Sequence, residues 1–579
     1  MRSSLFLSLS AAIAVLAAVH PSRSDYVVKS SHFVPPGWER MSKASAEHNI
    51  DLRIGIKQSS FHELERHLYE VSDPDHARYG QHLSAEDVQA LVAPAQHSLD
   101  SVEEWLEGHG IYTEHVEYSP SRDWATLTLP VSKVEQLLDA EYHIYRNSKG
   151  EEVVRTVGYS LPKHLHEHID TIQPTNHFSA PRSTESMNPC ASTLDERCLA
   201  GNVHSRRSYT DICAVCNETA GITSKCLRTL YETINYKPRS GKKNSAGSVS
   251  YFGQDQYLAS ERPDADRNYG FSRQTIGNIT ELSPFGVNTA LQILGAFAAP
   301  ARLKVYLTGG PPPPFQPDTA TPENTNEPYL TWLNYIAKQK KVLYVITQSY
   351  GDHEQTVPRD YATRVCQEYA QLGARGATVV ALSGFFGNTT SFRPFYPASC
   401  PYVLTVEGTQ KFNPEVVLEG IVTEGDPTNY TSGSGFSDHF ARPSYQDHAV
   451  SKSLAKLGKR NSGLYNRKGR AFPDVAAHGT TFNYIRNGIS DTTQGAEVPM
   501  LTVAGVLTQV NDAILAAGKR PVGFLNPLLY KTKGCGFTDI TKGSSTDCDT
   551  DGFPAGKGWD VASGWGTPNF EAIRKHLGV

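Results

Sequence analysis

The stretch that decides the fold is Thr492-Thr493-Gln494-Gly495-Ala496-Glu497-Val498-Pro499, together with the apolar run that follows it to Gly518. Pro499 can open a helix, because its missing N–H would be unpaired in a first turn anyway. An apolar stripe at helical spacing follows, and the polar residues within it are predicted to turn away. The stripe consists of Val503, Val506, Leu507, Val510 and Ile514, and the polar residues are Gln509, Asn511 and Asp512. The stretch therefore predicts a core helix that ends near Gly518.

A small-residue turn before such a helix has two interpretations. It can simply lead into a core helix. It can also hold a nucleophile at the helix N-terminus, where backbone N–H groups favour developing negative charge. Gly495 stands where that nucleophile would be, and glycine has no side chain.

Length and composition limit the class of protein. A chain of 579 residues predicts two domains. Its net charge of −5 gives no reason to expect nucleic acid or an anionic membrane as a partner. Residues 1–24 predict a signal peptide, because Arg2 precedes an apolar run that is too short to span a bilayer. No later run reaches the roughly 20 apolar residues of a transmembrane helix.

Secretion agrees with the cysteine content and with four glycosylation acceptor motifs. The chain has nine cysteines, which predicts disulfides with at least one thiol left over. The acceptor asparagines are Asn217, Asn278, Asn388 and Asn429. We expect a secreted, extracellular monomer.

Residues 25–180 predict a small α+β domain of the ferredoxin-like kind. Strands are predicted at 52–56 and 124–129, and helices at 61–71, from Ser84 onward, at 101–109 and at 131–138. The domain has no nucleophile or ligand cluster of its own. From its residues alone it could be a permanent binding module.

Residues 181–247 predict an irregular, cysteine-containing linker that leads into the next domain. Its cysteines are Cys190, Cys198, Cys213, Cys216 and Cys226. Cys213 and Cys216 are spaced as in a redox pair, but a plain disulfide is the more common outcome in a secreted linker. Arg206-Arg207 is either a processing site or a solvated charge pair.

From residue 248 to residue 579, strand-like runs alternate with helical ones. The predicted strands begin at Val249, Leu303, Val342, Ala377 and Tyr402, and the predicted helices cover 284–297, 328–340, 358–373 and 499–517. This alternation is typical of an α/β fold with a doubly wound parallel sheet and helices on both faces. Functional groups of such a sheet lie at the carboxyl ends of its strands.

Five segments resemble the sedolisin (serine-carboxyl peptidase) family, and its fungal tripeptidyl-peptidase branch in particular. They are Asp73-Pro-Asp-His-Ala-Arg-Tyr-Gly-Gln-His-Leu-Ser, Tyr329-Leu-Thr-Trp-Leu-Asn-Tyr, Ser349-Tyr-Gly-Asp-His-Glu-Gln-Thr-Val-Pro, Gly469-Arg-Ala-Phe-Pro-Asp-Val-Ala-Ala and Gly558-Trp-Asp-Val-Ala-Ser-Gly-Trp-Gly-Thr-Pro-Asn-Phe. The resemblance implies a subtilisin-like peptidase domain after a pro-kumamolisin-type activation prodomain, which covers the cleft until it is cut away. Self-cleavage is common in the family, so a chain without catalysis should keep this prodomain unless another protease cuts it.

The family's catalytic positions have changed in this sequence. The resemblance places a Glu base, an Asp one helical turn later, an oxyanion-site Asp and a Ser nucleophile at positions that read Asn288, Gln292, Phe385 and Gly495. Amides cannot take up a proton near neutral or mildly acid pH. Residues near in sequence do not restore a spaced pair of nucleophile and base; they are His478, Asp491, Thr492, Thr493 and Glu497. We therefore expect no catalytic residue at the matched positions.

The C-terminal loop keeps the family's calcium pattern. The resemblance assigns carboxylate ligands to Asp539 and Asp560, and carbonyl ligands to Ile540, Gly556 and Gly558. Calcium takes six or more hard oxygens, so this set is reasonable. The run Asp547-Cys-Asp-Thr-Asp-Gly imitates part of an EF-hand but lacks its final Glu, and is interpreted as a solvated acidic turn. The expected disulfides are Cys535–Cys548, which would pin this loop, and Cys366–Cys400.

These patterns predict a secreted, calcium-binding sedolisin-family protein that has lost hydrolysis. Its ligand would be a peptide or protein held in the old cleft, where the substrate-side segments 349–352 and 432–436 persist. One alternative is an active serine-type endopeptidase or tripeptidyl-peptidase that releases tripeptides at acid pH from a rebuilt site. Another is a structural or decoy protein with nothing in the cleft.

Overall fold

The protein is described by a computed structural model over residues 25–31, 33–34, 38–147, 152–176, 215–216, 221–251, 271–276, 287–308, 327–384, 392–418, 433–486, 489–493, 495–547 and 550–579. Several predicted features lie outside these ranges, namely the signal peptide, Cys190, Cys198, Arg206-Arg207, Cys213, Asn217, Asn278, Phe385, Asn388, Asn429 and Cys548.

The N-terminal domain, residues 25–176, is built on a four-stranded antiparallel sheet in the order β4-β5-β3-β9. Its strands are β3 (Asn49–Ile56), β4 (Glu117–Tyr118), β5 (Trp124–Pro130) and β9 (Ile169–Gln173). The helices are α1 (Phe61–Ser72), α2 (Ala85–Val92), α3 (Gln96–Gly108) and α4 (Val131–Leu138). This strand order and the placement of the helices confirm the predicted ferredoxin-like arrangement.

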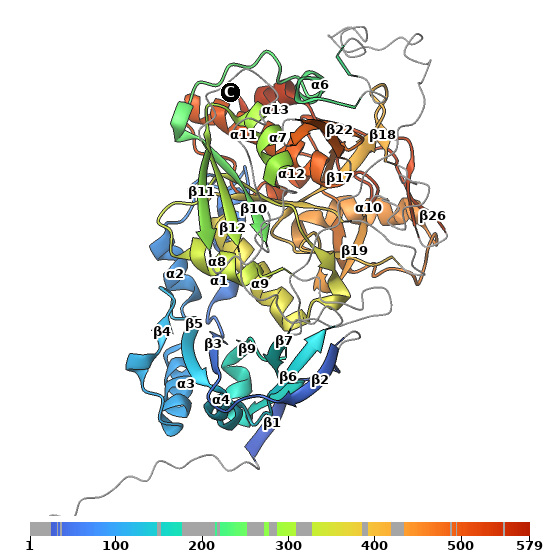
Figure 1. The fold of residues 1–579 in the computed structure, drawn as a ribbon. Coiled ribbons are helices and arrows are strands. Elements are labelled where there is room, and N and C mark those ends of the chain that lie inside the picture. The colour runs from blue at the N-terminus through green and yellow to red at the C-terminus, as the bar shows by residue number, and fades with distance from the viewer. Residues whose placement is uncertain are drawn as a thin grey trace, which may run out of the picture.

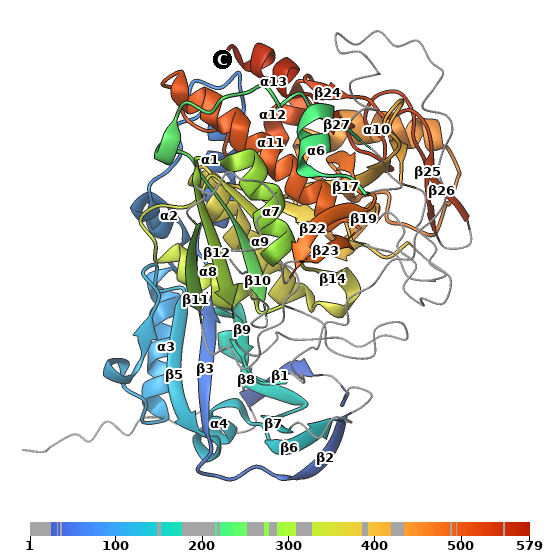
Figure 2. The same ribbon diagram turned by 45° about the horizontal axis from the view of Figure 1, so that its top comes forward.

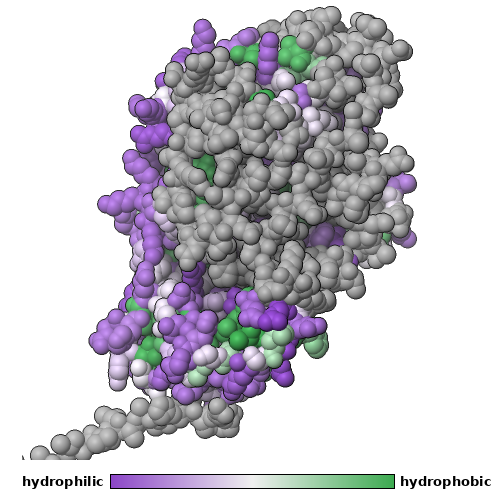
Figure 3. Space-filling view, in the orientation of Figure 1, coloured by the Kyte–Doolittle hydropathy of each residue, from purple (hydrophilic) through white to green (hydrophobic). Residues whose placement is uncertain are grey.

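Ser84 begins α2 as the sequence predicts. Its hydroxyl accepts from the backbone N–H of Asp87, and the Asp87 carboxylate accepts from the Ser84 N–H, which completes a capping box. Five further strands extend the domain: β1 (Tyr26–Ser31), β2 (Trp38–Lys43), β6 (His143–Asn147), β7 (Glu152–Arg155) and β8 (Gly158–Pro162). Apolar side chains gather on one face of this domain (Figure 3), and it holds every exposed large apolar residue of the described chain, such as Val28 and Phe33.

The C-terminal domain, which begins at residue 215, contains the main sheet. Seven parallel strands lie in the order β11-β12-β10-β13-β15-β17-β21, and β18 joins β17 antiparallel. The strands are β10 (Ser245–Tyr251), β11 (Phe271–Ile276), β12 (Arg302–Thr308), β13 (Val345–Gln348), β15 (Thr378–Leu382), β17 (Leu404–Gln410), β18 (Val416–Val417) and β21 (Val475–His478). The strand expected from Val342 begins at Val345, because residues 342–344 are only partly buried. Figure 1 shows β10, β11 and β12 pointing toward the N-terminal domain.

Helices cover both faces of the sheet, as alternating burial requires. Val345 and Val380 pack with α7 (Val287–Ala298) and α11 (Glu497–Ala516) on one face. Their neighbours Ile346 and Val379 pack on the other face with α8 (Tyr329–Ala337) and α9 (Arg359–Ala374). Figure 2 shows α7 and α11 side by side, and their backbones approach so closely at Gly505 that a Cβ there would lie 2.6 Å from the Phe297 ring. The predicted doubly wound α/β domain is confirmed.

The core helix predicted after Gly495, α11, differs from its prediction in two respects. α11 begins at Glu497, two residues before Pro499, and it is buried on all sides. The three polar residues expected to face solvent are buried and bonded: Gln509 donates to the Phe297 carbonyl, Asn511 accepts from the Val522 N–H and Asp512 accepts from the Tyr236 hydroxyl. α11 is also long and apolar enough to cross a membrane, although we expected no such run after the signal peptide. However, 94% of its apolar window is buried inside the protein.

Shorter elements complete the domain. They are α6 (Ser224–Leu230), β14 (Asp352–His353), β16 (Phe395–Tyr396), β19 (Gly435–Ala441), α10 (Asp447–Leu457), β20 (Gly469–Phe472), β22 (Phe482–Arg486), β23 (Ile489–Thr493), α12 (Asn526–Lys531), β24 (Phe537–Thr538), β25 (Ser544–Asp547), β26 (Thr550–Pro554), β27 (Thr567–Pro568) and α13 (Phe570–Leu577). Within the motif at 469–477, Arg470 and Asp474 form a fully buried ion pair of 2.6 Å.

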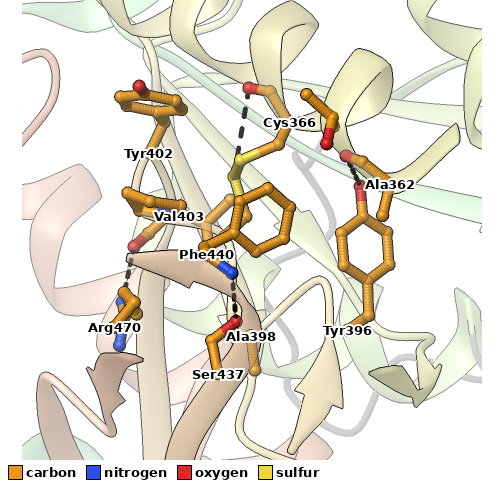
Figure 4. Close-up of a disulfide and its surroundings, with 12 residues drawn as sticks. Ala362, Cys366, Tyr396, Ala398, Tyr402, Val403, Ser437, Phe440 and Arg470 are labelled. Atoms are coloured by element: carbon orange, nitrogen blue, oxygen red, sulfur yellow. Dashed lines mark hydrogen bonds between the residues drawn. A yellow bond between two sulfur atoms is a disulfide. The ribbon is translucent and has the colours of Figure 1, made fainter. Parts of the chain in front are cut away.

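Two disulfides lie in the described part of the chain. Cys366–Cys400 confirms the prediction and ties α9 to the loop before β17, where the Tyr396 hydroxyl also donates to the Ala362 carbonyl (Figure 4). Cys216 pairs with Cys226, which corrects the expectation that it pairs with Cys213. Cys535 carries an exposed free thiol in the described chain, and its predicted partner lies outside that part.

Candidate functional site

The strand order of the main sheet predicts a ligand site at the carboxyl ends of β10 and β13. From β10 the chain builds the sheet toward β11 and β12, and from β13 it builds toward β15, β17 and β21. Ligands of open α/β sheets bind where this direction reverses, at the carboxyl ends of the two neighbouring strands. Tyr251 ends β10 there, and Ser349 directly follows β13.

Gly495 lies in the turn before α11, as the sequence predicts. Its φ is +110°, a conformation that L-residues with a side chain rarely adopt, and its N–H donates to the Gly479 carbonyl at 3.2 Å. The predicted position of the nucleophile thus has neither a side chain nor a backbone suited to one.

Gln292 lies on α7 and binds β22, the first strand of the β22–β23 hairpin that leads to this turn. Its Nε2 donates to the Ile485 carbonyl at 2.7 Å, and its Oε1 accepts from the Ile485 N–H at 2.9 Å. An amide matches this donor and acceptor, whereas a carboxylate could only accept. Asn288 is on the same helix one turn earlier. The position that the resemblance assigns to the family's Asp thus joins α7 to β22 by two hydrogen bonds.

The backbone of the predicted oxyanion segment is tightly packed. Ser383 donates to the buried Glu407 carboxylate at 2.7 Å. Gly384 has a φ of +103°, and a Cβ there would lie 2.3 Å from the Phe395 ring. A Cβ on Gly433 would lie 2.6 Å from the Gly384 carbonyl carbon. This close approach explains the glycines at 384 and 433.

The turn that contains Ser434 uses this residue structurally. The Ser434 hydroxyl is buried and donates to Ser545 of β25 at 2.8 Å, and Phe436 stacks on Tyr465 with ring centroids 4.7 Å apart. Ser434 therefore fixes this turn to a neighbouring strand.

His478 is the one imidazole among the residues weighed as substitutes. It ends β21 beside the Gly479–Gly495 contact, and burial lowers its pKa to about 3, so it is neutral. Its Nε2 lies 2.6 Å from the Thr480 hydroxyl and its ring stacks on Phe412. Thr492 and Thr493 lie in β23, paired with β22.

The structure brings together one pair that the sequence analysis did not connect. Glu497 begins α11, and burial raises the pKa of its carboxyl to about 7, while the Ser349 hydroxyl beside it acts in the opposite direction. Ser349 Oγ and Glu497 Oε1 are both shielded from solvent, and neither makes a hydrogen bond of normal geometry within the described chain. The sequence held one signal for this pair: Ser349 follows a predicted strand, Glu497 lies near the start of a predicted helix, and both positions fall at the carboxyl edge of the sheet.

The predicted calcium loop brings two carboxylates together. Asp539 accepts from the Gly558 N–H at 2.8 Å, and Asp560 accepts from the Gly556 N–H at 2.7 Å. Burial raises the pKa of Asp560 to about 7, and the charge of Asp539 acts in the same direction. Carboxylates that repel each other in this way fit a cation between them. Among the described residues, no group of three or more His, Cys, Asp or Glu side chains could hold a metal ion.

Comparison with known proteins identifies a matching family model and several relatives of this chain. A family model described as the pro-kumamolisin activation domain matches residues 36–178. The chain is 31% identical to tripeptidyl-peptidase SED2 of Arthroderma otae, over 99% of this chain and 100% of that protein. It is 32% identical to tripeptidyl-peptidase SED4 of the same organism, over 98% and 97%.

Among solved structures, Pseudomonas sedolisin, a serine-carboxyl proteinase, matches 62% of this chain and 98% of its own at 16% identity, with a TM-score of 0.49. The curated relatives cover nearly the whole chain at more than 30% identity. The chain therefore belongs to the sedolisin family, in its tripeptidyl-peptidase-like branch.

Proposed function

We propose that this chain is a secreted, calcium-binding sedolisin-family protein without peptidase activity, which binds peptides in the inherited cleft. The observation that carries the loss of activity is Gly495, whose φ of +110° disfavours any side chain at the position of the nucleophile. Loss of the catalytic triad of a serine peptidase costs about 10⁶ in rate, and one oxyanion donor about 10²–10³.

Peptide binding is supported by what remains at the switch point. Ser349 and Tyr350 follow β13, and Gly384 lies two residues beyond the end of the neighbouring strand β15. The relatives are named for removing tripeptides, so the ligand class is an extended peptide. Main-chain groups at a strand end can bind such a chain without any reacting side chain.

Calcium binding is supported by the paired carboxylates of Asp539 and Asp560, with carbonyls of Ile540, Gly556 and Gly558 as further ligands. Bound Ca²⁺ would supply positive charge that neutralises the buried carboxylate of Asp560 and the exposed carboxylate of Asp539. Asp560 already connects its loop internally, because it accepts from the N–H groups of Ala562 and Ser563. The ion would stabilise the fold, since it binds only the folded chain.

The second candidate is an active serine-type peptidase with a rebuilt site, and the contact between Ser349 and Glu497 favours it. Glu497 could act as a base because its pKa is near 7. However, the Ser349 hydroxyl is shielded from solvent, so a substrate carbonyl has no access to it. We therefore rank this candidate second.

One experiment separates the candidates. The purified full-length protein is incubated with tripeptide-releasing substrates at acid pH beside Ser349→Ala and Glu497→Gln. We expect no turnover from any of them. Turnover by the wild type that both substitutions abolish would establish the rebuilt site.

Binding is measured by calorimetry with a peptide panel. Tyr350→Ala should weaken peptide affinity about 10-fold, because it removes the half-buried aromatic ring that follows Ser349 in the chain. Tyr112→Ala, on an exposed part of the N-terminal domain, should not. If no peptide binds the wild type, the protein is a structural or decoy protein and the binding proposal fails.

A further inference from the structure

We propose that the C-terminal domain binds an acidic polysaccharide through a basic strip on α10. The strip consists of Lys452 and Lys456 of α10, together with Lys459 and Arg460, which follow the end of this helix. It includes none of the residues to which we assign peptide or calcium binding, so the inference goes beyond the function proposed above. Figure 1 shows α10, in orange, at the side of the C-terminal domain next to β26.

The segment that carries the strip has a one-sided charge. No acidic residue occurs between Asp447 and Asp474, whereas basic residues recur throughout: Lys452, Lys456, Lys459, Arg460, Arg467, Lys468 and Arg470. Only Arg470 among them is buried, in its ion pair with Asp474. The net charge of −5 is an average over the whole chain and does not show this local excess. Such an excess attracts anions to one part of the surface.

α10 packs one side on the core and presents the strip on another. Ala449, Val450 and Leu454 are buried in the apolar core of the domain, whereas Lys452 and Lys456 are exposed. Residues four apart lie on the same side of a helix, about 6 Å apart along its axis. Lys459 and Arg460 are exposed as well and continue the strip beyond the helix. The charges therefore form a row rather than a scatter.

The cations of this row are not used within the fold. The ammonium groups of Lys452 and Lys459 make no hydrogen bond or ion pair within the part of the chain that the structure describes. Arg460 approaches Asp551 at 3.8 Å, but both side chains are exposed and such a pair contributes little. These charges are therefore available to a ligand.

The C-terminal end of α10 does not need the strip as a cap. The carbonyls of Leu454 and Gly458 accept from the Arg467 guanidinium at 3.3 and 3.1 Å. Lys456 is held in position by the Lys557 carbonyl, to which its ammonium donates at 2.5 Å. Lys557 is exposed and adds a further cation beside the strip. The row is thus built on a fixed helix end.

The surroundings of the strip favour an acidic polysaccharide over other polyanions. Basic surfaces that bind membranes also insert apolar side chains, but all exposed large apolar residues of the described chain belong to the N-terminal domain. Single-stranded nucleic acids stack their bases on aromatic rings. The ring of Tyr465, which Arg467 links to the end of α10, is already covered by Phe436 at 4.7 Å and Arg467 at 5.9 Å. A chain of acidic sugars needs only a row of point charges such as lysines provide.

The test measures binding of the purified full-length protein to heparin, a sulfated polysaccharide, by calorimetry in about 0.15 M salt. We expect binding that weakens as the salt concentration rises, and none to uncharged dextran. The double variant Lys452→Gln/Lys459→Gln should weaken heparin binding at least about 10-fold. Because these ammonium groups have no partner in the fold, the variant should melt at the same temperature as the wild type.

The matched control is Lys242→Gln/Lys243→Gln, which removes the same charge from an exposed turn elsewhere and should leave heparin binding nearly unchanged. A wild type that does not bind heparin, or two double variants that weaken binding equally, would overturn the strip as a binding site. Duplex DNA, or vesicles that contain phosphatidylserine, binding more tightly than heparin at the same salt concentration would overturn the polysaccharide as its ligand.

Discussion

Gln292 and Ile485 exchange two hydrogen bonds, so that one side-chain amide pairs with one backbone amide as two strands would. This pair joins α7 to β22, the strand whose hairpin leads to Gly495. The position that the resemblance assigns to the family's orienting Asp therefore makes a donor-and-acceptor pair that a carboxylate cannot make.

Gln292→Glu should destabilise the protein at neutral pH by about 1–3 kcal/mol, because a carboxylate would face the Ile485 carbonyl. The pKa of the new carboxyl should be raised in the folded state. Stability should therefore fall as pH rises above the unfolded value of about 4.3 and recover at more acid pH. Urea unfolding at both pH values measures this. Gln136→Glu, exposed on α4, is the control, and equal losses for the two variants would contradict the explanation.

Gly495→Ser should not restore hydrolysis. The φ of +110° at this position should make any L-residue costly, by about 1–3 kcal/mol in thermal unfolding. Adding Asn288→Glu and Gln292→Asp should still give no activity, because the backbone and the α7–β22 tie are altered as well. A triple variant that releases tripeptides while Gly495→Ser does not would show that only the side chains were lost.

Calcium removal should lower stability if the ion binds at the C-terminal loop. At a calcium concentration 100 times its Kd, binding contributes about 2.7 kcal/mol, and a chelator should remove this in a thermal melt. Asp560→Asn should abolish the difference between melts with and without chelator. Asp551→Asn, in the exposed EF-hand-like turn, should leave it intact; the opposite pattern would move the ion to that turn.

Glu497→Gln should make the protein more stable above pH 7. Burial raises the pKa of Glu497 from 4.5 to about 7, so the folded protein binds more protons than the unfolded chain between these values. Wild-type stability should thus fall by about 3 kcal/mol as pH rises through this window, and the variant should lack this fall. Glu86→Gln, an exposed first-turn acid of α2, serves as control. A wild type and variant with the same pH profile would mean that Glu497 is solvated.

Local pattern was enough to predict the classes of element. Alternating apolar runs predicted the parallel sheet and its helices, and Ser84 with Asp87 predicted a helix start, because these signals depend on neighbours along the chain. The same reasoning failed for Gln509, Asn511 and Asp512, which look like a polar face but bond to other elements inside the core. Periodicity measures average polarity and does not record which buried partner a polar side chain has.

The sequence by itself determined that Gly495 has no side chain, that Asn288 and Gln292 are amides and that Asp539 and Asp560 lie in the C-terminal segment, because residue identity settles those points. Only the tertiary structure decided that Cys216 pairs with Cys226, that Gln292 binds Ile485 and that Ser349 meets Glu497. Each of these contacts joins segments that folding, not chain order, brings together.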